Sequence, residues 1–297
     1  MNILITGVTE THVNHPQRAS STKFVSIPEL MREAYISLGH DVDHRGVTPG
    51  EDLSRYQKIF VYVYPLDHNA KSDGAAYTLA RRPDAMVCLD DWSFQKIMAS
   101  WDTVLGQDLL STYTWIAPLF PWGKPSAMGL EVAKILPWDP SPLYTCPPVF
   151  KHAWQQRQTA WYNASLSAEA HHWAEKQNLT WPIHSVGGKA LGQPRILESD
   201  VVWQYGSFKG ILCPTYTHAG CGWWRVRYLH AMHAGCILGG DQAELGMIHK
   251  AYDYTLADYE AMNDDDLQLA AANQGRALEK LIATKTETFK RLESFLK

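Results

Sequence analysis

Short, continuously apolar runs that alternate with segments of helical periodicity are the feature of this sequence that most restricts its fold. In the first half, the runs that predict strands are Asn2–Thr6 (ending at Gly7), Asp41–His44, Lys58–Tyr64 and Ala85–Leu89. The segments between them predict helices: one starts near Pro28 and ends at Gly39, and another spans Gly74–Arg82 and stops before Pro83. Buried strands alternating with helices predict a parallel sheet that is covered on both faces.

A proline-rich segment divides the chain. Leu136–Pro148 holds five prolines in thirteen residues, which disfavours sheet and helix and predicts an extended connector. Beyond it we expect strands at Val149–His152, Pro182–Val186, Ile211–Cys213 and Cys236–Leu238, and helices at Ser167–Gln177, Trp223–Ala234 and from about Asp265 to the end. The prediction is therefore an α/β protein of two Rossmann-like domains, 1–140 and 146–277, with a C-terminal helix at about 278–297 that joins the first domain.

Composition excludes several classes of protein. The 27 Lys and Arg residues against 31 Asp and Glu give a net charge of −4, so no chain-wide basic field exists to hold a polyanion. The N-terminus does not resemble a signal peptide and no apolar run is long enough to span a membrane, so we expect a soluble, cytoplasmic protein. The five cysteines have no C-x-x-C spacing, which predicts buried thiols rather than disulfides or a zinc site.

Ligands of open parallel sheets bind beyond the carboxyl ends of the strands, so the residues after each strand are the first candidates. Gly7 and Thr9 follow the first strand and could approach a cofactor, although a plain turn explains the glycine equally well and no G-x-G-x-x-G is present. Asp90 and Asp91 follow the Ala85–Leu89 strand. One could cap the next helix while the other acts as a general base, and we favour Asp91 as the base.

Arginines mark two further places in the second half. Gln156 and Arg157 were expected to follow the strand at Val149–His152 and could meet a phosphate, although a solvated loop arginine is nearly as good an interpretation. Arg225 and Arg227 stand at a helix start, where unpaired amides and the helix dipole favour an anion, and His230 shares a face with Arg227. His230 and His233 also form an H-x-x-H pair, but without a third ligand we predict no metal site.

The segment Arg227-Tyr-Leu-His-Ala-Met-His-Ala-Gly235 resembles the nucleotide-sugar helix of GT-B glycosyltransferases, in which two Rossmann-like domains face each other across a cleft. Within that class the chain is similar to bacteriophage DNA β-glucosyltransferases, which glucosylate hydroxymethylated pyrimidines. The similarity extends over most of the chain: the first strand and its loop, the strand that ends at Asp90-Asp91, the proline connector, the arginine helix and the closing helix.

The resemblance implies roles for individual residues. Asp91 matches the family's catalytic aspartate, Arg227 its diphosphate-binding arginine, and Arg157 more loosely a second arginine, while His230 stands where the family has a ribose-binding glutamate. It further implies UDP-glucose as the donor and allows Mg²⁺ or Mn²⁺ at the diphosphate. The implied partner is duplex DNA with hydroxymethylated pyrimidines, with the enzyme a monomer in the host cytoplasm.

The DNA contact would have to be local, because the chain as a whole is acidic. The basic residues considered for the rim of the cleft are Lys71, Arg81, Arg82 and Lys124, and Trp92 could stack on an extruded base. Two alternatives remain open. One is a GT-B enzyme acting on a small molecule or a polysaccharide, and the other is a non-catalytic nucleotide-binding protein.

Overall fold

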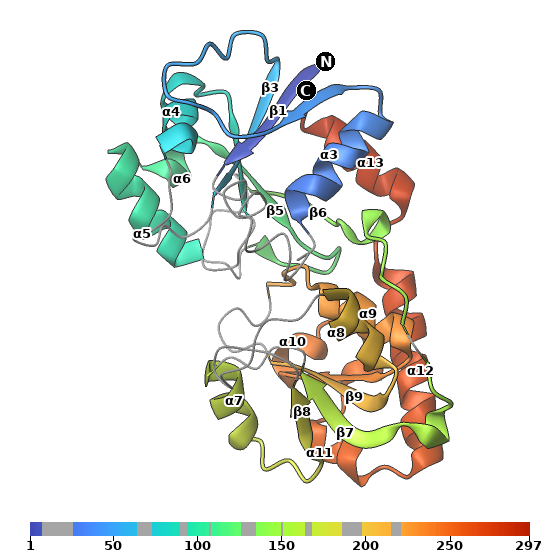
Figure 1. The fold of residues 1–297 in the computed structure, drawn as a ribbon. Coiled ribbons are helices and arrows are strands. Elements are labelled where there is room, and N and C mark those ends of the chain that lie inside the picture. Colours follow the sequence, from blue (N-terminus) through green and yellow to red (C-terminus); the bar gives the residue numbers. More distant parts are fainter. Residues whose placement is uncertain are drawn as a thin grey trace. The chain divides into compact units, whose positions relative to one another are not determined.

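The computed structural model describes residues 1–7, 26–63, 73–89, 94–106, 108–125, 135–149, 151–163, 168–185, 198–214 and 221–297 of the 297-residue chain. Within these ranges the chain forms two compact units, residues 1–144 together with 283–297 (unit 1) and residues 145–282 (unit 2). Each unit is built on its own sheet, of six and four strands (Figure 1). All strand pairs are parallel, which confirms the predicted α/β class with Rossmann-like units.

The sheet of unit 1 has the strand order β2-β1-β3-β4-β5-β6. The strands are β1 (Asn2–Gly7), β2 (Asp41–His44), β3 (Lys58–Val63), β4 (Met86–Leu89), β5 (Thr114–Pro118) and β6 (Ile135–Trp138). The first four confirm the strands expected from the apolar runs. The side chains of Ile3, Leu4, Ile5 and most of β3 are buried, as expected for strands with a covered face on each side.

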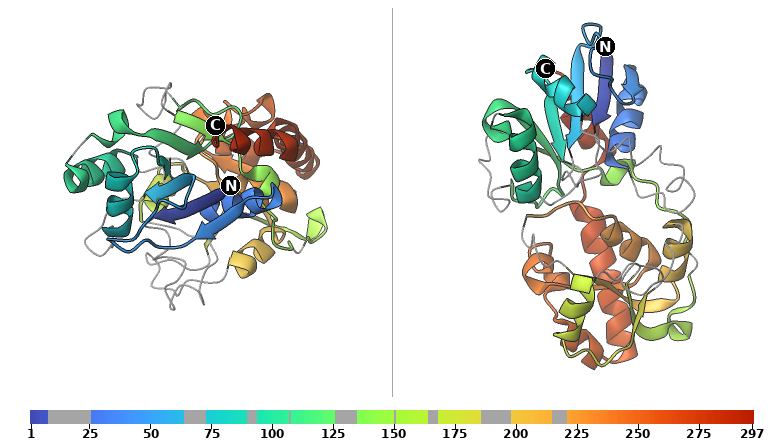
Figure 2. Two further views of the ribbon diagram at one scale, coloured as in Figure 1. Left: turned by 90° about the horizontal axis from the view of Figure 1, so that it is seen from above. Right: turned by 60° about the vertical axis from the view of Figure 1, so that its left-hand side comes forward.

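Helices cover both faces of this sheet. They are α3 (Ile27–Ser37), α4 (Asp73–Arg81), α5 (Phe94–Leu105), α6 (Leu109–Thr112) and α13 (Lys285–Ser294). Figures 1 and 2 show α3 and α13 on one side of the sheet and α4 and α5 on the other. The C-terminal helix is tied to the N-terminal part of the unit, because the Tyr35 hydroxyl donates a 2.9 Å hydrogen bond to the carbonyl of Leu292.

Strand β6 overturns part of the expected connector. Leu136–Trp138 was expected to lie outside any sheet, yet it pairs with β5. β6 is an edge strand, and the Pro137 carbonyl accepts a 2.7 Å hydrogen bond from Nε of Arg291 on α13. Because the N and C=O of one strand residue point to the same side, the missing N–H of Pro137 faces away from β5. The edge position therefore lets proline enter the sheet without loss of a ladder hydrogen bond.

Unit 2 has a four-stranded sheet with the order β10-β9-β7-β8. Its strands are β7 (Gln158–Asn163), β8 (Ile183–Ser185), β9 (Phe208–Cys213) and β10 (Ile237–Gly240). Its helices are α7 (Ala168–Glu175), α8 (Glu198–Tyr205), α9 (Val226–Ala234), α10 (Gln242–Leu245), α11 (Leu256–Ala261) and α12 (Asp264–Leu281). α9 ends at Gly235 with φ +64°, which confirms the predicted glycine C-cap.

The first strand of unit 2 is not where the sequence predicted it. The described residues of the expected strand, Val149, Lys151 and His152, have no strand structure. A short 3₁₀ turn at Trp154–Gln156 follows them, and β7 begins only at Gln158. Only Val149 and Phe150 are apolar in the expected strand, whereas Ala160–Asn163 of β7 are all buried between β8 and β9. The residues Gln156 and Arg157 therefore precede a strand instead of following one.

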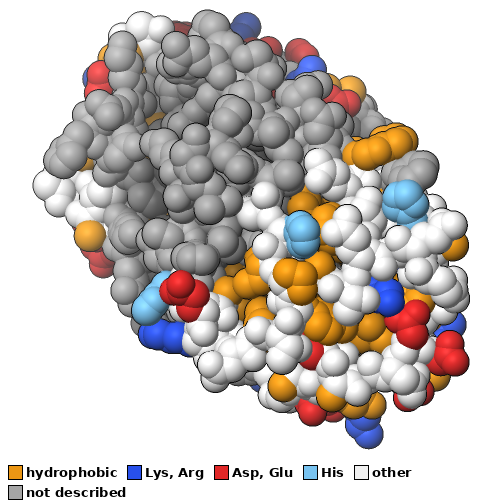
Figure 3. Space-filling view, turned by 60° about the horizontal axis from the view of Figure 1, so that its bottom comes forward, with side chains coloured by type: hydrophobic (Ala, Val, Ile, Leu, Met, Phe, Trp, Pro, Cys, Tyr) orange, Lys and Arg blue, Asp and Glu red, His pale blue; other side chains and the backbone are white. Residues whose placement is uncertain are grey.

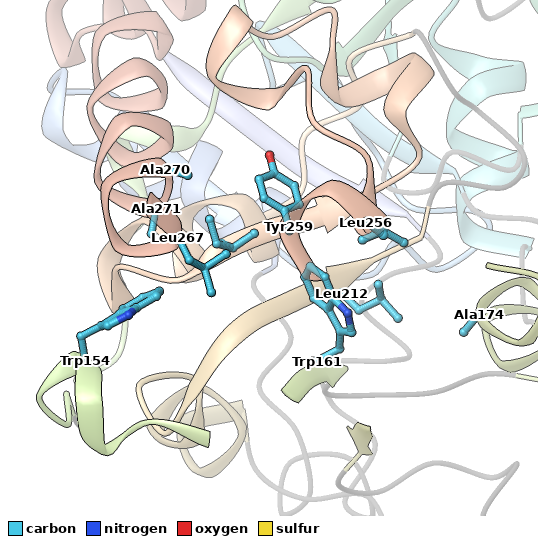
Figure 4. Close-up of a cluster of buried hydrophobic side chains, with 10 residues drawn as sticks. Trp154, Trp161, Ala174, Leu212, Leu256, Tyr259, Leu267, Ala270 and Ala271 are labelled. Carbon is cyan, nitrogen blue, oxygen red and sulfur yellow. The ribbon is translucent and has the colours of Figure 1, made fainter. Parts of the chain in front are cut away.

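One face of this sheet carries an aromatic core (Figure 4). Trp161 of β7 and Tyr259 of α11 meet edge to face, with ring centroids 6.5 Å apart, in one cluster with Leu212 and Leu256. The outer edge of β10 is closed by the buried Gln274 of α12. Its Oε1 accepts a hydrogen bond from the N–H of Leu238 (2.8 Å), and its Nε2 donates to the carbonyl of the same residue (3.3 Å). α12 thus protects an edge that would otherwise expose unpaired backbone groups.

The cysteines are thiols, as their spacing predicted. All five cysteines are free, and four of them are buried. None of the helices in the described ranges combines the length and the apolar character that crossing a bilayer requires.

Candidate functional site

The strand order of unit 2 defines where a ligand would bind. α7 leads from β7 to β8 at one edge, whereas β9 lies on the other side of β7 and continues to β10 at the opposite edge. The direction of the connections therefore reverses between β7 and β9. In open parallel sheets the crevice beyond the carboxyl ends of the strands at such a reversal is the ligand site. Here these ends are Asn163 and Cys213.

The start of α9 brings two arginines to this place. Nη1 of Arg225, the N-cap residue, donates to the carbonyl of Pro214 (3.3 Å) and to Sγ of Cys213 (3.6 Å) at the end of β9. Nη1 of Arg227 donates to Oδ1 of the fully buried Asn163 at the end of β7 (3.2 Å). The predicted residues Arg225 and Arg227 therefore contact the ends of both strands that flank the reversal.

The electrostatics of this edge favour an anion. Among the described residues, α9 has no side-chain N-cap hydrogen bond, and the helix dipole places partial positive charge at its start. Within the described ranges, no carboxylate forms an ion pair with Arg227. Two guanidinium groups and a helix N-terminus together fit phosphate oxygens.

His230 lies one turn after Arg227 but is turned into the interior, with 3% of its surface exposed. Burial, together with the positive charges of Arg227 and His233, lowers the pKa of His230 to about 3, so the ring is neutral. The ring packs edge to face on Tyr205 of α8, with centroids 5.3 Å apart. A buried ring is poorly placed to contact a ribose, which was its expected role.

Arg157 lies at the other end of α9. Its Nη1 donates to the carbonyl of Gly235 (2.9 Å) and to Sγ of Cys236 (3.5 Å), and its Nε donates to the carbonyl of His152 (3.2 Å). Gly235 is eight residues from Arg227, or about 12 Å along the helix at 1.5 Å per residue. The expectation that Arg157 and Gln156 follow a strand and face the ligand together with Arg227 is therefore wrong, because both precede β7.

In unit 1, Gly7 ends β1 and has a backbone reason to be glycine. Its φ is +139°, and a Cβ at this position would lie 2.0 Å from the carbonyl oxygen of Tyr62. The register Gly7–Tyr62 and Tyr62–Cys88 aligns the carboxyl ends of β1, β3 and β4. The chain thus leaves β4 at the same edge as Gly7. Thr9 and Asp91 lie outside the described residues.

A small hollow of about 240 Å³ adjoins the carboxyl end of β10. Gly240 at that end pairs with Cys213, the β9 residue that Arg225 contacts, so the hollow lies one strand from the arginines. Its lining residues are Trp173, Gln177, Gly240, Asp241, Gln242, Thr255 and Leu256. None of the site residues predicted from the sequence lines this hollow.

Asn163, which accepts a hydrogen bond from Arg227, was also not among the predicted site residues. Asn163 stands in an Asn-Ala-Ser sequence and follows the aromatic pair Trp161-Tyr162, a strand-favouring signal that could have located β7 and its polar end. The described residues contain no group of three or more His, Cys, Asp or Glu side chains that could hold a metal ion. The guanidinium groups of Arg225 and Arg227 are cations and do not coordinate divalent ions.

The basic residues considered for DNA contact are spread out. Arg82 is engaged with Asp84 (2.7 Å) and with the carbonyls of Leu53 and Tyr56 (2.9 Å each), while Arg81 lies beside the ring of Tyr77. Lys124 is exposed, and Lys71 and Trp92 lie outside the described residues. On the face drawn in Figure 3, the described Lys and Arg side chains are scattered, several beside acidic groups, and form no broad basic patch.

No model of a known protein family matches this chain, and no curated protein sequence does. Solved structures do match it. Structures of T4 phage β-glucosyltransferase superpose over the whole chain: the complex with UDP and Mn²⁺ has a TM-score of 0.65 at 11% identity and covers 100% of both chains. A second, on substrate binding, has a TM-score of 0.60 at 11% identity with the same coverage. A third, of the DNA-modifying enzyme with and without uridine diphosphoglucose, has a TM-score of 0.55 at 9% identity and covers 99% of this chain and 98% of that one. At this identity the likeness establishes the GT-B fold of the chain.

Proposed function

We propose that this protein is an inverting glycosyltransferase that transfers a sugar from a UDP-sugar, UDP-glucose in the first instance, to the hydroxymethyl group of modified pyrimidines in duplex DNA. The observation that carries the proposal is the arginine pair at the start of α9, which contacts the ends of both β7 and β9 where the sheet reverses. The full-length likeness to T4 phage β-glucosyltransferase supports this chemistry over other uses of a paired Rossmann fold.

In this proposal unit 2 holds the leaving group. The diphosphate of the donor lies at the start of α9, with Arg225 and Arg227 on its oxygens. As the bond between the anomeric carbon and the diphosphate oxygen breaks, negative charge grows on that oxygen. The two guanidinium groups and the helix dipole stabilise it. Arg157 takes no part in this step, because its Nε and Nη1 donate to the carbonyls of His152 and Gly235 at the other end of the helix.

Unit 1 supplies the base. Asp91 comes two residues after β4, at the edge where β1, β3 and β4 end together. Its carboxylate takes the proton from the acceptor hydroxymethyl group while that oxygen attacks the anomeric carbon, and UDP leaves from the opposite side. One displacement of this kind inverts the anomeric configuration.

The experiment that tests the proposal supplies labelled UDP-glucose and three duplexes of one sequence that contain hydroxymethylcytosine, hydroxymethyluracil or only ordinary bases. We expect label in a hydroxymethylated duplex and none in the ordinary one. D91N should abolish transfer while UDP binding, measured by calorimetry, stays within about threefold of wild type, because the variant removes the base and leaves the donor site intact. A donor screen with other UDP-sugars by thermal shift identifies the sugar.

The second candidate is a GT-B enzyme with a small-molecule or polysaccharide acceptor. The observation that keeps it open is the net charge of −4, because the chain has no overall basic field to attract DNA. Duplex binding measured at several salt concentrations separates the two. A DNA acceptor predicts affinity that falls steeply with salt. UDP-sugar hydrolysis without any salt-sensitive duplex binding would select the second candidate. A non-catalytic nucleotide-binding protein would bind UDP, show no turnover, and be unaffected by D91N.

A further inference from the structure

The hollow beside the carboxyl end of β10 has a size and a lining that fit one class of ligand. Its volume of about 240 Å³ lies below the roughly 300–1,000 Å³ of pockets that hold drug-sized molecules. It is therefore too small for a whole nucleotide and suits a single ring with its substituents. Trp173 of α7 contributes an aromatic side chain to the wall, and Leu256 of α11 an aliphatic one.

Two glutamines of the wall are held in place by hydrogen bonds of the fold. The amide nitrogen of Gln177 donates to the carbonyl of Trp173 (3.2 Å). The amide nitrogen of Gln242 donates to the carbonyl of Asp253 (2.6 Å). These side chains are therefore restrained before a ligand arrives, which reduces the conformational entropy lost on binding.

Asp241 gives the hollow its charge. It is the only ionisable residue among the described residues that line the hollow. A carboxylate accepts hydrogen bonds from hydroxyl groups and repels phosphate and carboxylate groups. A sugar ring offers hydroxyl groups at its rim and apolar C–H groups on its faces. The faces match Trp173 and Leu256, and the rim matches Asp241.

The hollow is close enough to the arginines for one ligand to occupy both. Gly240 pairs with Cys213, whose Sγ lies 3.6 Å from Nη1 of Arg225, and adjacent strands are about 4.8 Å apart. In a nucleoside diphosphate sugar a single oxygen joins the ring to the second phosphate, so the ring lies next to the diphosphate. The end of β7 is occupied by Asn163 and Arg227, whereas the end of β10 carries the hollow.

We propose that the hollow at the end of β10 is the pocket for the sugar of the donor, and that Asp241 makes this pocket selective for neutral hexoses. The carboxylate accepts hydrogen bonds from ring hydroxyl groups, while Trp173 and Leu256 pack on the C–H faces. This inference rests on the proposed function in taking the ligand to be a UDP-sugar. It goes further by assigning residues to the sugar and by excluding negatively charged sugars.

The test compares UDP, UDP-glucose and UDP-glucuronic acid in calorimetry on the full chain without an acceptor. UDP lacks the sugar, and glucuronic acid adds one carboxylate to the same ring. We expect D241A to weaken UDP-glucose binding about tenfold while UDP stays within about threefold, because the side chain contacts the sugar alone. Wild type should bind UDP-glucuronic acid at least about fivefold more weakly than UDP-glucose, and D241N should remove most of that difference.

D265N is the matched control. It removes the same charge from an exposed position on α12, outside the hollow, and should change each affinity by no more than about twofold. The inference is overturned if both Asp241 variants bind UDP-glucose as wild type does, or if D241N keeps the full preference against UDP-glucuronic acid. If D241A loses UDP binding as well, D241N, which keeps the size of the side chain, decides. Loss of UDP binding in both variants would make Asp241 a structural residue and would also overturn the inference.

R227A separates this inference from the proposed function. If wild type does not bind UDP, both fail together. If UDP binds through Arg227 while the Asp241 variants treat the three ligands as wild type does, the anion site stands and only the sugar pocket is lost. If the Asp241 variants behave as expected but no hydroxymethylated duplex is labelled, the sugar pocket stands and the DNA acceptor is lost.

Discussion

The two ends of α9 both hold arginine side chains, but the arginines are used in opposite ways. At the C-terminal end, Arg157 gives its donors to the carbonyls of Gly235 and His152 and lies 5.3 Å from the ring of Trp154. At the N-terminal end, Arg227 donates one hydrogen bond within the described part of the chain, to Asn163. The first arrangement completes the fold, since unpaired carbonyls and the negative end of the dipole attract a cation.

The N-terminal arrangement is electrostatically unfavourable without a ligand. Arg225 and Arg227 add positive charge where the helix dipole is already positive, which is unfavourable until an anion arrives. An arginine near a helix end therefore indicates a ligand site only when it is known which end of the helix it occupies. A cation at the C-terminus is explained by structure alone. Two cations at the N-terminus oppose the helix dipole and therefore indicate a site for an anionic ligand.

We expect the largest effects from R227A and R157A, which should change UDP affinity and stability in opposite ways. R227A should weaken UDP binding about 100-fold, because it removes a charged contact to a diphosphate. The unfolding free energy of the ligand-free protein should fall by no more than about 1 kcal/mol, because relief of a charge that opposes the helix dipole offsets part of the loss of the hydrogen bond to the buried Asn163. Calorimetry and urea unfolding measure the two quantities. Equal affinity for both variants would remove the anion site from this end of α9.

R157A should have the reverse effect. It leaves the carbonyls of Gly235 and His152 without their donor and uncovers the ring of Trp154, so we expect a loss of about 2 kcal/mol in the unfolding free energy. UDP affinity should stay within about threefold of wild type. A large loss of UDP affinity with unchanged stability would instead return Arg157 to the ligand site.

The sequence predicted this difference only in part. Gly235 and the helical spacing before it located α9 and its end, and the arginines at its start followed from the same pattern. The end at which Arg157 lies depends on where β7 begins, which the pattern did not give. Strand boundaries come from pairing with distant residues, here Trp161 with Ile183 and Gly210, and such pairing leaves no local signal. The same cause hid Asn163.

Two other features show the limit of local rules. The five prolines of Leu136–Pro148 predicted a connector, yet Pro137 lies in β6 because an edge strand needs no second set of N–H donors. The family resemblance implied a ribose contact for His230, and only the packing of α8 on α9 shows that the residue is buried. Spacing defines which residues share a helix face, but the neighbours of that face come from the tertiary fold.

The variant G235A tests how much the glycine C-cap contributes to stability at the C-terminal end of α9. The residue has φ +64°, and a Cβ there would find no atom closer than 4.0 Å, so the cost is backbone strain without a clash. We expect a loss of about 1 kcal/mol in the unfolding free energy. G39A in unit 1 is the matched control, with φ +83° and open space, and should cost about the same. A much larger loss for G235A would mean that the change also displaces Arg157.

The acid sensitivity of the fold is the smallest expected effect, and it separates His230 from His233. The pKa of His230 falls from 6.5 to about 3 because the ring is buried and lies beside Arg227, so the unfolded chain takes up a proton that the folded chain refuses. Stability is therefore lost as the pH falls from about 6.5 toward 3, by ~1 kcal/mol between pH 6.5 and 5.5. H230Q should remove this part of the slope, measured as urea unfolding at the two pH values. H233Q should remove less, because His233 is exposed and its pKa is lowered without so deep a burial. If wild type and H230Q lose the same unfolding free energy over this interval, the imidazole of His230 is not held neutral in the fold. α9 would then carry a titrating charge one turn from Arg227.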